Sequence, residues 1–149
     1  AEQFPSVNTK PQVVALQAGE SFTTPRFEVT TAPTVHPVVG LCYRFRDLRT
    51  DASLAVTGDT AYRLPLADHV RGVDLLVHEA SRGACASDPN ARNGHSGSID
   101  AARIALAGEV GKLGLIHYPS AARQEILAAA CEVFPETVAL QEGDRIELC

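Results

Sequence analysis

Histidine and carboxylate side chains follow several apolar segments or a glycine-containing loop, at the points where those segments end. The residues are His36, Asp59, Glu79, His95 and His117. Imidazole nitrogen and carboxylate oxygen are ligands that Zn²⁺ prefers, and a catalytic zinc site keeps one position for a water molecule whose pKa falls to about 7. Because a folded sheet can gather strand ends at one edge, we expect these side chains to meet there. The sequence therefore predicts a hydrolytic metal centre.

Each of these residues has an ordinary alternative when it is taken alone. His36 could be a loop histidine, and Asp59 could cap a helix. His78 is expected to support the core rather than bind metal, and His69 is expected on the surface of a helix. The shared position at successive strand ends favours a metal site for the set as a whole.

Short runs of apolar and β-branched residues predict the strands that position these side chains. Residues 12–16 and 27–31 flank a turn signal and predict antiparallel strands that lead into His36. Residues 41–46 alternate with the period of a half-buried strand. Buried strands are expected over residues 53–56, 73–77 and 113–116, where the apolar runs are continuous.

Two helices are predicted in the second half of the chain. The first starts at Ser98 as its N-cap, after a Gly- and Ser-rich loop over residues 81–97. The second covers residues 121–134, and residues 137–149 predict a hairpin. The inner face of the first helix is expected to hold Ile99, Ala102, Leu106 and Val110.

Length and composition predict one domain of an ordinary globular protein. Of the 149 residues, 45% are hydrophobic and 21% are charged. Residues 1–10 are polar and are expected to form a loose arm before a domain at 11–149. No apolar run approaches the roughly 20 residues that span a bilayer, so no membrane partner is expected. The net charge of -5 provides no basic surface, which favours a small substrate over RNA.

Four cysteines are widely spaced and form no C-x-x-C pair. They are Cys42, Cys85, Cys131 and Cys149. This spacing predicts free thiols in the cytoplasm, whereas a secreted, disulfide-linked binding domain is an alternative that rests on the cysteines alone. The chain has no methionine, even at position 1, so we expect it to be a processed or truncated product.

Several of these segments occur in a recognisable order. They are Phe27 to His36 with Tyr43-Arg44-Phe45, Thr57-Gly58-Asp59-Thr60, Asp74 to Ala80, His95-Ser96 and Leu115-Ile116-His117. This order resembles the metallo-β-lactamase superfamily, and within it the spacing is most similar to ribonuclease Z and phosphodiesterase-like members. The resemblance runs from about Pro11 to Cys149. It implies an α/β (α+β) fold, the αββα sandwich, of which this chain would be the C-terminal half.

The resemblance also implies a role for each candidate residue. His36 and His117 would be terminal ligands of a pair of zinc ions or other divalent metals, and Asp59 would bridge the two ions. His95 would be the general acid that protonates the leaving oxygen, and Glu79 would orient it. A carboxylate behind an imidazole fixes the tautomer of the ring, which is the physical reason for such a pairing.

The chain also departs from the family pattern. The leading motif His-x-His-x-Asp-His is absent, so we expect the N-terminal half to be supplied by the same precursor or by a separate chain, with a homodimer as a further possible assembly. Gly97 stands where Thr or Ser is usual, Ser81 stands where Thr is usual, and no Ser-x-Arg segment follows His117.

The predicted function is a zinc-dependent hydrolase in which a metal-bound hydroxide attacks a small phosphodiester or ester. The alternative is an inactive or half-domain module that needs a partner chain to supply the missing motif. Metal content discriminates between the two functions, because only the first requires this chain to contribute ligands.

Overall fold

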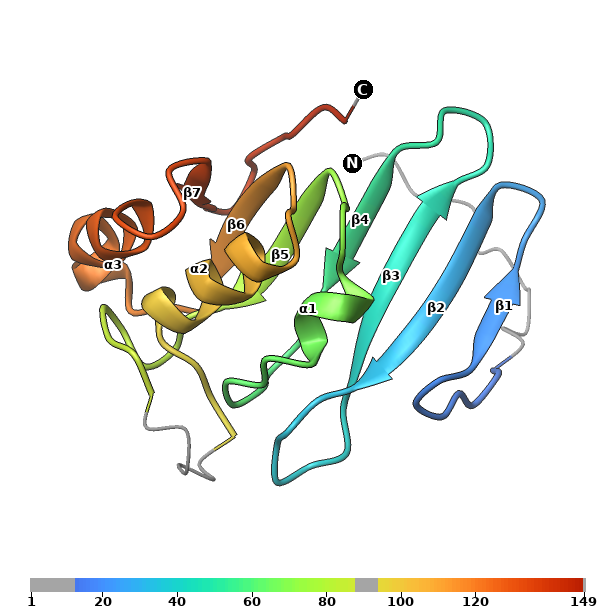
Figure 1. Cartoon of the computed structure of the whole chain (residues 1–149), viewed down its shortest axis with the longest axis horizontal. Helices are drawn as coiled ribbons and strands as arrows, with labels where there is room; N and C mark the ends of the chain where they lie inside the picture. Colours follow the sequence, from blue (N-terminus) through green and yellow to red (C-terminus); the bar gives the residue numbers. More distant parts are fainter. Residues whose placement is uncertain (1–12, 88–93, 149) are drawn as a thin grey trace, which may run out of the picture.

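The computed structural model describes residues 13–87 and 94–148, so the arm predicted at 1–10 lies outside the described residues. A seven-stranded sheet carries helices packed against it (Figure 1). The strands are β1 Ser21–Thr23, β2 Phe27–Pro33, β3 Leu41–Asp47, β4 Ser53–Val56, β5 Leu75–Glu79, β6 Lys112–Ile116 and β7 Thr137–Ala139. The helices are α1 Leu66–His69, α2 Ser98–Ala107, the short 3₁₀ turn η1 Ser120–Ala122 and α3 Arg123–Cys131.

The order of the strands in the sheet is the same as their order in the sequence. Strands β1 to β4 pair antiparallel, whereas β4 to β7 pair parallel across helical connections. Strand β2 therefore runs in the same direction as β4, β5 and β6. The C-terminal ends of these four strands lie on the same side of the sheet, as the sequence predicted. Four of the candidate residues lie at or just after those ends.

One face of the sheet and the three helices share a single hydrophobic core. Ala55, Leu76 and Leu113 are in register on neighbouring strands and are fully buried. They pack in one cluster with Ile104 of α2 and Ile126 of α3. Helix α2 can lie close to the strands because much of its inner surface is alanine, whose side chain is small. The buried core holds the strand ends, and with them the candidate site, in fixed positions.

Two predicted strands are wrong. Residues 13–16 form no strand, and Val13 and Val14 are 87% and 66% exposed. The turn at Gly19 instead precedes the first strand, and β1 pairs with β2 through residues 21–23. In the predicted hairpin at 137–149, only β7 forms, and the described residues after the 143–144 turn pair with no strand.

The predicted helices are correct in type but differ in detail. Gly97, not Ser98, is the N-cap of α2, and the helix ends at Ala107 before the cap Gly108. Leu106 is 56% exposed, because the buried face is formed by the residues Ala101, Ala102, Ile104 and Ala105. Helical periodicity identified the helix, but contact with the sheet determines which alanines face inward.

Burial of His78 predicts a loss of stability in acid. His78 is 1% exposed, and its Nδ1–H donates to the backbone oxygen of Glu79 at 2.8 Å. Desolvation lowers the pKa of His78 below its ordinary value. Below a pH of about 6.5, His78 binds a proton in the unfolded chain but not in the folded chain. The folded state therefore loses stability as the pH falls from that value toward the lowered pKa of the folded state.

We therefore expect the free energy of unfolding to decrease between pH 7 and pH 5, by up to about 1.4 kcal/mol per pH unit for this residue. His78→Asn keeps an N–H donor but cannot titrate, so its pH slope should be smaller. Urea unfolding of both proteins at several pH values measures this slope. Desolvation also lowers the pKa of His69, which adds to the slope in both proteins. Equal slopes in the two proteins would contradict the role of His78.

The three described cysteines, Cys42, Cys85 and Cys131, are free thiols. Cys42 is buried in the core, and burial raises its pKa to about 12. Within the described ranges, no helix has both the length and the apolar character needed to cross a membrane.

Candidate metal centre

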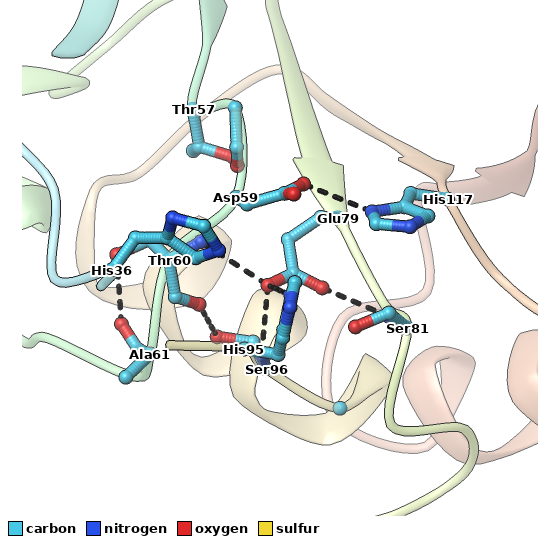
Figure 2. Close-up of polar contacts among 12 residues, drawn as sticks. His36, Thr57, Asp59, Thr60, Ala61, Glu79, Ser81, His95, Ser96 and His117 are labelled. Carbon is cyan, nitrogen blue, oxygen red and sulfur yellow. Dashed lines mark hydrogen bonds and ion pairs between the residues drawn. The ribbon is translucent and has the colours of Figure 1, made fainter. Parts of the chain in front are cut away.

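Four strand ends bring the candidate side chains to one place, and Figure 2 shows them facing a common space. His36 follows β2, Asp59 follows β4, and His117 follows β6 directly. Glu79 is the last residue of β5. His95 comes from the loop before α2. The five residues predicted from the sequence are thus neighbours in the fold, although they lie far apart along the chain.

Two overlapping sets of donor atoms are close enough to hold a metal ion. In the first set, His36, Asp59 and His95 offer atoms that all lie within 4.8 Å of one another, and in the second the same holds for Glu79, His95 and His117. His117 Nδ1 also lies 2.9 Å from Asp59 Oδ1, which joins the two sets. The donors are imidazole nitrogen and carboxylate oxygen, so the site fits a divalent ion such as zinc.

The predicted ligand trio differs in one respect from these sets. His36, Asp59 and His117 do not form a set by themselves among the described residues, and both sets include His95, whose ring is near both of the other histidines. Its ring centroid is 5.1 Å from that of His36 and 5.7 Å from that of His117. Asp59 shares a donor set with His36 and His95 and also forms a 2.9 Å contact with His117, so its carboxylate lies near all three histidines.

The site is open to solvent on the side of Asp59 and His117. The side chains of Asp59 and His117 are 39% and 53% exposed, and that of His95 is 31% exposed. A cavity of about 420 Å³ lies beside His117, which lines it together with Tyr118, Ser120, Arg123 and Gln141 among others. The side chains of Asp59 and His117 are therefore accessible to solvent on this side.

The buried carboxylate of Glu79 accepts hydrogen bonds from three loops, and we call this arrangement the Glu79 network. Its side chain is 1% exposed. Oε1 accepts from the backbone N–H of Thr60 at 3.1 Å and of Ser96 at 2.9 Å, and Oε2 accepts from the N–H of Ser81 at 2.9 Å. His95 Nδ1 lies 3.2 Å from Oε1. This contact directs the opposite edge of the ring, which carries Nε2, away from Glu79 (Figure 2).

His117 has an unusual backbone conformation. Its φ angle is +51°, in the left-handed region that few residues other than glycine adopt. Such a conformation costs on the order of 1 kcal/mol or more and persists where the surrounding structure imposes it, often at functional sites. Here it turns the chain sharply after β6. Sequence reasoning missed this conformation, because a histidine at the end of a strand does not by itself indicate a positive φ angle.

Gly97 departs from the family pattern because its backbone packs against another segment. A Cβ atom at this position would lie 2.0 Å from the carbonyl oxygen of Cys85, so a Thr or Ser would force the two segments apart. The Gly97 N–H donates to the buried carboxylate of Asp100 at 3.1 Å, and so does the N–H of Ser87. These contacts fix the end of the loop that carries His95. Sequence reasoning missed this packing, because Cys85 lies in a segment without regular structure.

Comparison with known proteins identifies relatives of the chain, although no family model matches it. It is 40% identical over 97 residues to ribonuclease Z of Bradyrhizobium sp., which covers 62% of this chain and 31% of that protein. It is 31% identical over 120 residues to the probable metallo-hydrolase YhfI of Bacillus subtilis, which covers 79% of this chain and 48% of that protein. The chain thus spans about a third to a half of the length of these relatives.

Two solved structures share the fold of this chain. The crystal structure of the metallo-β-lactamase fold protein YhfI from Bacillus subtilis superposes with a TM-score of 0.73 and 27% sequence identity, over 85% of this chain and 51% of that one. The human short-form tRNase Z superposes with a TM-score of 0.56 at 22% identity, which is evidence for the fold alone. The chain therefore has the fold of the metallo-β-lactamase superfamily, and its sequence is similar to the ribonuclease Z and YhfI members of that group.

Proposed function

We propose that the chain is the C-terminal half of a zinc-dependent hydrolase that cleaves phosphodiester bonds. The observation that carries this proposal is the meeting of two donor sets at four strand ends, next to a histidine held by a buried carboxylate. In this proposal His36, Asp59 and His117 are metal ligands, with Asp59 between two ions. His95 and Glu79 act on protons rather than on the metal.

The residues of the chain perform distinct tasks in the proposed reaction. A bound divalent metal would supply an activated water and would polarise a phosphoryl oxygen. His95, held through Nδ1 by Glu79, presents Nε2 as the atom that delivers a proton to the leaving alkoxide oxygen. Glu79 stabilises the positive charge of the ring before the transfer and keeps its orientation. The exposed edge near His117 and Asp59 admits the substrate.

The missing ligands come, in this proposal, from an N-terminal half that carries the motif His-x-His-x-Asp-His. The sheet face opposite the helices carries apolar, half-buried side chains on neighbouring strands, among them Tyr43, Phe45, Leu54, Val56 and Val77. An apolar sheet face is stabilised by packing against another layer. A second sheet from the N-terminal half would bury this face and complete the αββα sandwich. The free thiols support a reducing compartment such as the cytoplasm.

The substrate class is a phosphodiester, of which two kinds are to be compared. Relatives named ribonuclease Z support RNA, whereas the net charge of -5 supports a small substrate. The proposed function is tested with the chain assembled with its N-terminal half, zinc, and either bis(4-nitrophenyl) phosphate or a short RNA. Hydrolysis that requires metal supports the proposal. Stoichiometric zinc without hydrolysis of either substrate would contradict the phosphodiesterase assignment.

His95→Ala is expected to lower turnover by about a hundredfold or more and to leave bound zinc unchanged, because a general acid typically contributes that much to rate. Zinc content and turnover of the assembled enzyme are measured side by side. The matched control is His69→Ala, since His69 lies in α1 and belongs to neither donor set. His95 belongs to both donor sets, so loss of zinc in His95→Ala would make it a ligand instead of an acid.

A second candidate function is an inactive half-domain that only supports a partner chain. This function is favoured by the coverage of the relatives, because the chain matches only about a third to a half of their length. The purified chain distinguishes the two functions. Zinc bound at a stoichiometric level to the chain, or to the chain with its N-terminal half, supports the hydrolase, and a metal-free assembly supports the half-domain.

A further inference from the structure

Thr60 is 1% exposed, and each of its polar atoms takes part in a hydrogen bond. Its N–H donates to Glu79 Oε1 at 3.1 Å. Its Oγ1 accepts from the N–H of Val35 at 3.0 Å and donates to the backbone oxygen of Ala61 at 2.9 Å. Its backbone oxygen accepts from Ser96 Oγ at 2.7 Å. A buried residue with all of its polar groups paired holds its partners in one arrangement.

Each of these bonds reaches a segment that carries a candidate site residue. Val35 directly precedes His36, and Ser96 directly follows His95. Thr60 itself directly follows Asp59. The backbone bond from the Ala61 N–H to the Val35 oxygen, at 2.8 Å, doubles the connection to the His36 loop. Figure 2 shows Thr60 between these segments, behind the side chains that face the site.

We propose that Thr60 is a positioning residue whose hydroxyl and backbone oxygen fix the His36 loop and the His95 loop relative to Asp59. The donor atoms of His36, Asp59 and His95 lie within 4.8 Å of one another, so small shifts of either loop would separate them. Substitution of such supporting partners typically weakens metal binding about 10–100-fold. The consequence for metal binding rests on the proposed function, whereas the effect on the loops does not.

The test uses substitutions that separate the hydroxyl from the shape of the side chain. Thr60→Val removes the hydroxyl and leaves the Val35 N–H without its partner, while Thr60→Ser keeps the hydroxyl. Ser96→Ala removes only the bond to the Thr60 oxygen, so it should loosen His95 and spare His36. Thr137→Val is the matched control, because Thr137 is a buried threonine on β7 whose Oγ1 donates to the backbone oxygen of Phe134.

The decisive readout is NMR of the imidazole signals of the metal-free 149-residue chain. We expect Thr60→Val to shift or broaden the signals of His36 and His95, Ser96→Ala to change His95 alone, and Thr60→Ser and Thr137→Val to leave both as in the wild type. Unchanged His36 and His95 signals in Thr60→Val overturn the proposal. If Thr60→Val does not fold, Ser96→Ala gives the same decision through His95.

Titration with Co²⁺, followed by its visible spectrum, measures the consequence for the metal site. Thr60→Val should weaken Co²⁺ binding about 10–100-fold, and Thr60→Ser should restore it. If the wild-type chain binds no Co²⁺ while the NMR signals change as expected, the positioning role stands and the metal site of the proposed function fails in this chain. If Co²⁺ binds equally well to all variants and the signals are unchanged, Thr60 has no positioning role and the proposed function is unaffected.

Discussion

Asp59→Ala is expected to remove bound metal and activity together, with turnover lower by about a thousandfold or more. The physical reason is the position of Asp59 between the two donor sets. Its carboxylate shares one set with His36 and His95, and its Oδ1 lies 2.9 Å from His117 Nδ1. A metal ion contributes several kcal/mol of charge stabilisation to a hydrolytic transition state, which is lost when the ion is lost. Elemental analysis and turnover of the assembled enzyme measure the two effects.

Asp68→Ala is the matched control, because Asp68 is an exposed carboxylate on α1 whose main contact is an ion pair with Arg71. It should keep full metal content and turnover. Stability is a second check, since the half-exposed Asp59 contributes little to the core. The free energy of unfolding of Asp59→Ala without metal should therefore be close to that of the wild type. Metal retained in Asp59→Ala at the wild-type level would refute its assignment as a ligand.

Glu79→Leu is expected to lower the free energy of unfolding by about 3–5 kcal/mol, because it leaves buried donors without an acceptor. The backbone N–H groups of Thr60, Ser81 and Ser96 would all lose their partner. Glu79→Gln should cost less, about 1–3 kcal/mol. Its amide oxygen can still replace Oε1, where most of the donors converge, and only the bond from Ser81 is lost. Urea unfolding at pH 7 measures both variants.

The control for this series is Glu109→Leu, because the side chain of Glu109 is 76% exposed and makes only a surface ion pair with Arg71. Exposed ion pairs contribute about 0–1 kcal/mol, so a small change is expected. We therefore expect the loss of unfolding free energy to be largest in Glu79→Leu, smaller in Glu79→Gln and smallest in Glu109→Leu. Equal stabilities of Glu79→Leu and the wild type would show that the Glu79 network does not hold the loops together.

The sequence predicted the meeting of the site residues because the signal for it is local. An apolar run that gives way to polar residues marks the end of a strand, and His36, Asp59, Glu79 and His117 all lie at or within a few residues of such an end. The direction of the strands then follows from short antiparallel turns on one side and helical connections on the other. Together, the positions of the strand ends and the directions of the strands place these residues on the same side of the sheet.

The features that sequence reasoning missed depend on contacts between distant segments. Position 97 needs glycine because a side chain there would meet the carbonyl oxygen of Cys85. The proposed role of Thr60 depends on its hydrogen bonds to Val35 and Ser96, which are distant in the sequence. The left-handed φ of His117 has no counterpart in a local sequence signal such as a glycine. The strand predicted at residues 13–16 is absent for a related reason. A run of β-forming residues forms no strand when no neighbouring strand pairs with it.

The identical order of the strands in space and in sequence has a consequence for synthesis. Each new strand can pair with the one made just before it, so the sheet can grow at its edge as the chain leaves the ribosome, with no strand waiting for a distant partner. The described edge strands, β1 and β7, are only three residues long, so the finished sheet exposes a short edge to other chains at either side.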